Sequence, residues 1–375
     1  MRRSHLVFLI PLIACGPSFY QAPPSLGSYP ERIAAKRWQH IFAEAAPLDP
    51  ALPTRDALDE TCAKLMETLA PMDAKMRLAE IDRLLAENRN GPYSSRRANF
   101  LHELRELAGD APLFDSAKPY FEWRASHDTA IAPAPPKQRP WSMTEEEYGN
   151  ICQLYNAQLN DRLAGIDQEI ANAPAPLLPY WKVRRGAFLF ESKNYPEAAK
   201  EFSSMIEAFP THRRAEAAKL MLARAKLEQS RDLRREASFK NPTENDNEIA
   251  KLLDESTATL NEFIVTYPEG RFTADAEGWL GAIAFDQGRL GLAVRHQLAR
   301  LDRQPTREVT RTVLRECDRI FEKLLESREP GDSDTYPDPE IQFDAASVAK
   351  HPLVARLFVQ HTIDPAAHIT LPLYW

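Results

Sequence analysis

The stretch from Tyr180 to Pro210 constrains the fold of this chain more than any other part of the sequence. Its apolar residues recur at the spacing of one helix face, and a Tyr195-Pro196 pair interrupts them. This pattern predicts two short helices that pack face to face. The residues expected to shape that packing and end the unit are Gly186, Tyr195, Ala198, Phe202 and Pro210.

The same pattern recurs at residues 268–305, where Pro305 closes the unit. The positions of close approach, turn and facing alanine are taken by Leu280, Gly281, Gly288 and Ala293. Gly186 and Ala198 are twelve residues apart, as are Gly281 and Ala293. The equal spacing indicates a repeated helical hairpin.

A third hairpin is expected between these two copies, because residues 210–268 keep the helical pattern but are longer. Its second helix is predicted over Ile249–Val265. A polar surface loop that begins at Asp232 is predicted between its helices. Three stacked units satisfy the need of repeats for neighbours that bury their faces.

The order of small residue, turn aromatic, alanine, aromatic and proline resembles the tetratricopeptide repeat (TPR). The resemblance implies an all-α, helical-hairpin (TPR-like) right-handed solenoid, preceded by a helical N-terminal region, that holds another protein or peptide. In that family, the first helix of each repeat lines a concave groove. The matching positions here are Val183, Phe190, Glu191, Leu220, Arg224, Leu227, Glu228, Asp275, Phe285 and Asp286. For Phe190, Leu220 and Phe285, burial between helices is an equal alternative.

Two phrases, FPTHRRAEAAKLMLARAKL and YPEGRFTADAEGWLGAIAFDQGRL, are similar to the TPR lipoproteins of outer-membrane protein assembly. The N-terminus agrees with that resemblance. Arg2 and Arg3 precede a short apolar run, Leu6–Ala14, which is too short to span a bilayer and predicts a signal peptide. The run ends at Cys15 in a lipobox like that of bacterial lipoproteins. We therefore expect a lipid anchor on Cys15. Resemblance to Gram-negative lipoproteins implies that Gly16, a residue other than Asp after the cysteine, permits export to the outer membrane, and we expect the protein at its periplasmic face.

Proline-rich stretches set the expected organisation. We predict a signal peptide at 1–14, a lipidated tether at 15–30, a helical region at 31–130 and a linker at 131–141. A long helix plus the solenoid follows at 142–328, then an acidic linker and tail at 329–375. Ser142 and Glu145 are expected to form a capping box at the start of that long helix.

The sequence contains little that points to chemistry. It carries no HExxH, GxSxG, GxGxxG or phosphate-loop motif, and its formal charge of −7 argues against nucleic-acid binding. We expect no cofactor and no metal. Cys62 and Cys152 allow a disulfide or free thiols. Two weaker candidates for chemistry, His127-Asp128 and Glu145–Glu147, fit ordinary helix ends.

The sequence therefore favours a non-catalytic adaptor or scaffold that binds an envelope protein or peptide. One alternative is an envelope glycan-binding or glycan-processing protein, with helices that support a cleft near Trp123, His127, Trp141 and Glu145. Another is a truncated gene product.

Overall fold

The computed structural model describes residues 64–87, 94–127, 143–237, 245–326 and 345–363. The signal peptide, Cys15, Cys62, both Pro-rich linkers and the final tail therefore lie outside the described residues. No strand occurs in the described ranges, which confirms the all-α prediction. The helices fall into two compact units, and the division runs through a single helix, between Gly165 and Ile166.

The first unit contains residues 64–69 and the helices α4 (Ala74–Glu87), α5 (Ser94–Ala108), α6 (Ala111–Ser116) and α7 (Lys118–His127). All four helices lie within the helical region expected at 31–130. Asp110 caps the short helix α6, and Pro112 occupies its first turn. A buried cluster ties α5 to α7: Glu103 accepts hydrogen bonds from Arg124 and from the hydroxyl of Tyr120.

Helix α8 (Glu145–Asn172) is the predicted long helix, but its cap lies two residues later than expected. The carboxylate of Glu147 accepts a hydrogen bond from the backbone N–H of Thr144 at 2.8 Å, and Thr144 Oγ1 accepts one from the Glu147 N–H at 3.2 Å. These bonds lower the pKa of Glu147. The capping box of α8 is therefore Thr144 and Glu147, and Ser142, the first residue of the predicted box, lies outside the described residues.

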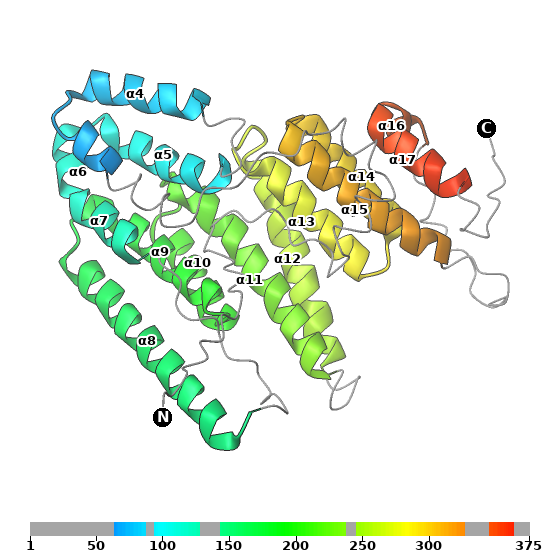
Figure 1. The fold of residues 1–375 in the computed structure, drawn as a ribbon, viewed down its shortest axis with the longest axis horizontal. Coiled ribbons are helices and arrows are strands. Elements are labelled where there is room, and N and C mark those ends of the chain that lie inside the picture. Colours follow the sequence, from blue (N-terminus) through cyan, green and yellow to red (C-terminus); the bar gives the residue numbers. More distant parts are fainter. Residues whose placement is uncertain (1–63, 88–93, 128–142, 238–244, 327–344, 364–375) are drawn as a thin grey trace, which may run out of the picture. The chain divides into compact units, whose positions relative to one another are not determined.

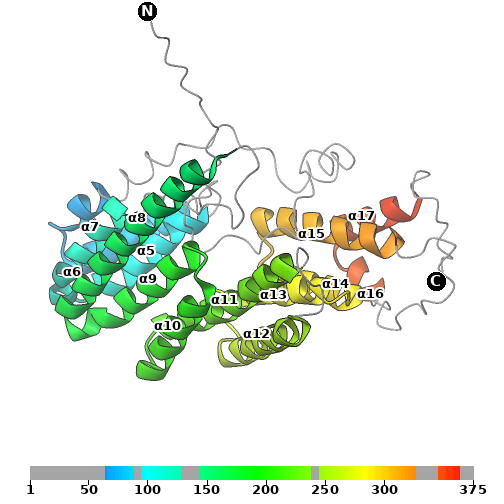
Figure 2. The ribbon, with the colours of Figure 1, turned by 90° about the horizontal axis from the view of Figure 1, so that it is seen from below.

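The second unit is a series of helical hairpins (Figures 1 and 2). A short 3-10 turn, η2 (Ala175–Leu177), leads into it. Its helices are α9 (Leu178–Glu191), α10 (Tyr195–Ala208), α11 (Arg214–Ala237), α12 (Asp246–Thr266), α13 (Thr273–Asp286), α14 (Leu290–Arg303), α15 (Arg307–Glu326), α16 (Ala345–Ala349) and α17 (Pro352–Ile363). Each helix from α9 to α15 packs on the next, and α11 also touches both α9 and α13. This is the predicted TPR-like solenoid.

The first and third hairpins turn in the same way. Lys193 and Gly288 both have positive φ, 61° and 77°. In each turn the following N–H reaches back to a helix carbonyl: Asn194 donates to Leu189 at 2.9 Å and Arg289 donates to Ala284 at 2.8 Å. Both ends are Schellman motifs. The positive-φ position of this turn favours glycine, as at Gly288, but in the first hairpin it is occupied by the exposed Lys193.

We expect Lys193→Gly to stabilise the protein by about 0.5–1 kcal/mol. Glycine removes the strain of a side chain at positive φ, and part of the gain is offset by a more flexible unfolded chain. The urea unfolding midpoint measures the change. Gly288→Ala is the matched control, and it should lower stability by about 1 kcal/mol. A lower midpoint for Lys193→Gly would contradict this account of the turn.

The hairpins close tightly at their glycines. A Cβ on Gly186 would lie 2.7 Å from the ring of Phe202, which is fully buried. A Cβ on Gly281 would lie 2.8 Å from the amide nitrogen of Gln297 and 3.4 Å from the carbonyl oxygen of Ala293. Ala198 was expected opposite Gly186. It is buried, but the side chain closest to Gly186 is the Phe202 ring, which lies one turn further along α10.

The middle hairpin is longer than predicted at both helix ends. Helix α11 continues to Ala237, so the first residues of the predicted loop are helical, and α12 begins at Asp246 rather than Ile249. Asp232 pairs with Arg235 one turn ahead, which supports the extension. Ser256 is fully buried, and its hydroxyl donates to the carbonyl of Ala223 at 2.8 Å. A small residue there lets α12 lie close to α11.

The solenoid ends with α15, and the two short helices α16 and α17 follow it. Val313, Ile320 and Phe321 of α15 share a core with Val354 and Leu357 of α17. Asp318 and His361 are buried beneath that core, with 2.6 Å between Oδ1 and Nε2. Cys317 is a buried free thiol, and its pKa is raised by burial and by Glu316 and Asp318.

A histidine at the start of α11 makes the unit sensitive to acid. Burial, with Arg214 and Arg213 nearby, lowers the pKa of His212 to about 4. Its Nδ1 accepts a hydrogen bond from the backbone N–H of Arg214 at 3.1 Å, and its ring lies against Tyr180. A protonated imidazole cannot accept that bond.

The unfolded chain therefore binds a proton at His212 more readily than the folded chain does. Stability is full above the ordinary histidine pKa of 6.5 and falls as the pH drops from there towards about 4. We expect this group to contribute about 1–2 kcal/mol after allowance for partial exposure. Urea unfolding of wild type and His212→Asn across that pH range measures it. Asn can accept the same bond without titrating, so parallel pH curves would contradict the prediction.

Candidate protein-binding surface

The first helices of successive hairpins, α9, α11, α13 and α15, present a row of charged and aromatic side chains that contact one another across the repeats. We call this row the ladder. Its members are Phe190, Arg224, Glu228, Arg231, Phe285, Asp286, Arg319 and Lys323. Neighbouring first helices lie close enough for these side chains to meet, as α9 does with α11 and α11 with α13.

Arg224 holds the near end of the ladder. Its guanidinium carbon lies 5.0 Å from the ring centre of Phe190 on α9 and 4.6 Å from that of Trp279 on α13. The side chain is buried, and one guanidinium nitrogen donates to the sulfur of Met221 at 3.2 Å. Cation–π contacts are stronger when they are desolvated, so this arginine joins three hairpins through their aromatic residues.

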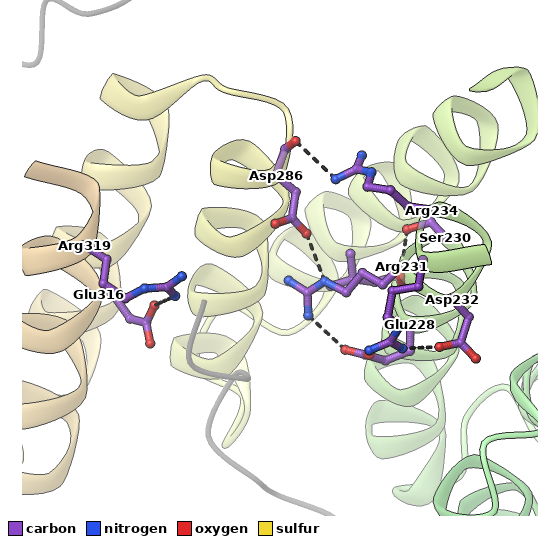
Figure 3. A network of polar contacts seen from close by, with 10 residues as sticks. Glu228, Ser230, Arg231, Asp232, Arg234, Asp286, Glu316 and Arg319 are labelled. Carbon is purple, nitrogen blue, oxygen red and sulfur yellow. Dashed lines mark hydrogen bonds and ion pairs between the residues drawn. The ribbon is translucent and has the colours of Figure 1, made fainter. Parts of the chain in front are cut away.

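Arg231, two turns further along α11, holds the middle of the ladder (Figure 3). It donates to Asp286 on α13 and to Glu228 on its own helix, each at 2.9 Å. Burial lowers the pKa of Arg231, but the two carboxylates outweigh that effect and the pKa stands above its ordinary value. Arg234 also reaches α13, where it donates to the backbone oxygen of Asp286 at 3.4 Å.

Phe285 and the cations of α15 form the far end. The guanidinium carbon of Arg319 lies 5.4 Å from the ring centre of Phe285, and Nζ of Lys323 lies 4.7 Å from it. Glu316 is 4.0 Å from the guanidinium of Arg319 (Figure 3). The ladder thus alternates aromatic, positive and negative groups, a mixture suited to a polar peptide or helix.

The structure divides the groove residues proposed from the sequence into two groups. Val183, Leu220 and Leu227 are almost fully buried and belong to the core, so we leave them out of the candidate surface. Arg224 is also buried, and we keep it in the ladder because its guanidinium contacts the rings of Phe190 and Trp279. Phe190, Glu191, Glu228, Phe285 and Asp286 are partly exposed. Asp275 is also partly exposed but pairs with Arg300 of α14, at 3.3 Å, and is not in the ladder.

Sequence analysis missed Arg231, Arg319 and Lys323 as ladder residues. Arg231 could have been found, because it follows Arg224 and Glu228 at helical spacing on one face of α11. Arg319 and Lys323 lie on α15, outside the three hairpins predicted from the repeat pattern. Five arginines between residues 213 and 235 are close in the sequence but do not form one basic face. Arg214 is buried, Arg231 and Arg235 are paired with acids, and Arg213 and Arg234 are exposed.

The described residues contain few groups of the kind that carry chemistry. They hold no set of three His, Cys, Asp or Glu side chains arranged to bind a metal ion. None of their helices combines the length and the apolar character needed to cross a bilayer. Cys152 is a free thiol. Asp128 and Trp141, from the weaker catalytic and glycan hypotheses, lie outside the described ranges.

Comparison with known families adds a second, independent observation. Residues 187–284 match the family model YfiO, described as an outer membrane lipoprotein. The matched segment contains the C-terminal end of α9, all of α10, the whole lengthened middle hairpin and nearly all of α13, so it includes Arg224 and Arg231. No curated protein and no solved structure is significantly similar to the chain. The chain is thus a TPR-like helical-hairpin protein that is similar, over residues 187–284, to the outer membrane lipoproteins of the YfiO family.

Proposed function

We propose that this protein is a lipid-anchored adaptor of the bacterial outer membrane, acting at its periplasmic face, that binds another envelope protein through the ladder and performs no catalysis itself. The match of residues 187–284 to a family of outer membrane lipoproteins supports this proposal most strongly. The lipobox at Cys15 agrees with it. The sequence also resembles the lipoproteins of outer-membrane protein assembly, and we therefore propose that the adaptor acts in that process.

The ladder supports binding in physical terms. Its side chains already hold one another in place, as with Arg231 between Glu228 and Asp286, so a partner meets an ordered surface. A preformed surface reduces the entropy lost on binding. Charges of both signs favour one partner over others more than they raise affinity.

Chemical cross-linking in intact cells tests the proposal. After detergent extraction, capture through a C-terminal tag and mass spectrometry would identify partners for wild type, Cys15→Ser and Arg234→Glu. Arg234 is an exposed residue beside the ladder, so its reversal should leave the fold intact. Arg295→Glu is the matched control, an exposed arginine on the second helix α14.

We expect a discrete envelope protein with wild type and Arg295→Glu, and a large loss of it with Arg234→Glu. Cys15→Ser should release the protein from the membrane fraction and weaken capture. A wild-type sample with no partner above background would refute the adaptor function. If Arg234→Glu captures as much partner as wild type, the partner does not bind at the ladder.

A further inference from the structure

Two cations at the far end of the ladder lack the close carboxylate partners that Arg231 has. Arg319 makes no hydrogen bond within the described residues, and one of its guanidinium nitrogens is buried without an acceptor. Its single ion pair there is with Glu316, at the 4.0 Å limit of such a contact. Lys323 forms no ion pair in the described part of the chain and lies over Phe285.

Arg231 shows what a satisfied cation on this surface looks like. Its side chain and that of Arg319 are almost equally exposed, 17% and 16%. Arg231 nevertheless has two carboxylates at 2.9 Å and a raised pKa, whereas the pKa of Arg319 is lowered. Burial lowers it most; Glu316, Asp286 and Glu322 raise it by less, and Arg231 lowers it further. Arg319 therefore lacks a full counter-charge.

The sequence spacing on α15 adds to this imbalance. Arg319 and Lys323 are four residues apart on one helix, and both converge on the ring of Phe285. Like charges at this spacing repel each other and weaken a helix. A carboxylate placed between them would remove the repulsion, and a guanidinium can bind a carboxylate through two parallel hydrogen bonds.

We propose that Arg319 and Lys323, seated on Phe285, form a binding site for the carboxylates of an acidic segment of a partner protein. This inference rests on the adaptor function and specifies the chemistry of the partner. The charge around the site favours a peptide over an anionic membrane. Glu228 and Asp286 lie on the same surface and would repel a continuous sheet of negative head groups, as would the net charge of −7.

Fluorescence anisotropy with the full chain in detergent tests the site. The probe is a short fluorescein-labelled polyglutamate peptide, with a polyglutamine peptide of the same length beside it. The variants are Arg319→Gln and Lys323→Glu. Lys323 is exposed, so its reversal should not disturb folding even if Arg319→Gln does. Arg295→Glu on α14 is again the matched control, because it makes the same charge change on another face.

We expect the glutamate peptide to bind about tenfold more weakly to either variant, since each loses a charge-assisted contact. The control should bind like wild type, high salt should weaken binding, and polyglutamine should not bind. Equal binding of the two peptides, or no change with Lys323→Glu, would overturn the site.

Vesicles of phosphatidylglycerol and phosphatidylethanolamine provide a further arm. If the protein binds vesicles but not the peptide, and Lys323→Glu abolishes vesicle binding, the ligand of the site is a lipid head group. That result would overturn the proposal. A negative result in the peptide and vesicle experiments would not change the result of cross-linking in cells. The adaptor function and the carboxylate site are therefore tested independently.

Discussion

Phe202→Ala should destabilise the second unit by about 3–5 kcal/mol, the largest effect that we expect of a single side chain here. Phe202 is fully buried on α10, and its ring fills the space that Gly186 leaves open on α9. Truncation removes the ring from the closest contact between the two helices. The urea unfolding midpoint measures the loss, and Ser204→Ala, at an exposed place on α10, should change stability by less than about 0.5 kcal/mol.

A double substitution makes this prediction more exacting. Gly186→Ala alone should lower stability by about 1–3 kcal/mol, since the new Cβ would lie 2.7 Å from a ring that cannot move away. In the Phe202→Ala background the same change should be neutral or stabilising, because the methyl group then occupies vacated space and alanine favours the helix. If Gly186→Ala has the same effect in both backgrounds, the ring does not explain the glycine.

Asp286→Ala should destabilise the protein by about 2–3 kcal/mol, although Asp286 is only a partly exposed surface residue. Its carboxylate is one of two that compensate the guanidinium of Arg231, at 2.9 Å. Removing it leaves a largely buried cation with Glu228 alone, and an incompletely paired buried charge is more damaging than the absence of both partners. Thermal and urea unfolding measure the change.

A second substitution, Arg231→Met, should compensate for Asp286→Ala. Arg231→Met added to Asp286→Ala removes the cation that was left unpaired, so most of the lost stability should return. Glu262→Ala is the control, because it breaks an ion pair between α11 and α12 in which the carboxylate is 68% exposed. That pair should contribute less than about 1 kcal/mol. A loss as large as that of Asp286→Ala would contradict this ranking of the pairs.

The hairpins were predictable from the sequence because the residues that shape each hairpin lie close together in the chain. Gly186 and Ala198 lie twelve residues apart within the first unit, and Gly281 and Ala293 repeat that spacing in the third. The end of α11 was not predictable in this way. Its last turns contain Asp232 and Arg235, polar residues that are typical of a loop in the sequence. In the structure they form an ion pair one turn apart, which supports the helix.

The candidate surface was only partly predictable, for a different reason. Positions on a first helix follow from the repeat pattern, and these include Phe190, Glu228 and Asp286. Their partners do not, because Arg231 meets Asp286 from 55 residues away in the chain. Burial was also hidden from the sequence: Leu227 and Phe285 occupy equivalent places in the pattern, yet Leu227 is fully buried and Phe285 remains partly exposed. Solenoid stacking decides which side chain a neighbouring repeat covers.

Arg224 touches aromatic rings of the hairpins before and after its own, and this has a mechanical consequence. An array held only by adjacent contacts can lose its units one at a time from either end. A side chain that spans three units resists this fraying, since peeling away either outer hairpin strips a ring from a buried cation. The middle of the array therefore behaves as a single elastic element, and strain applied at one end is transmitted through Arg224 to the other.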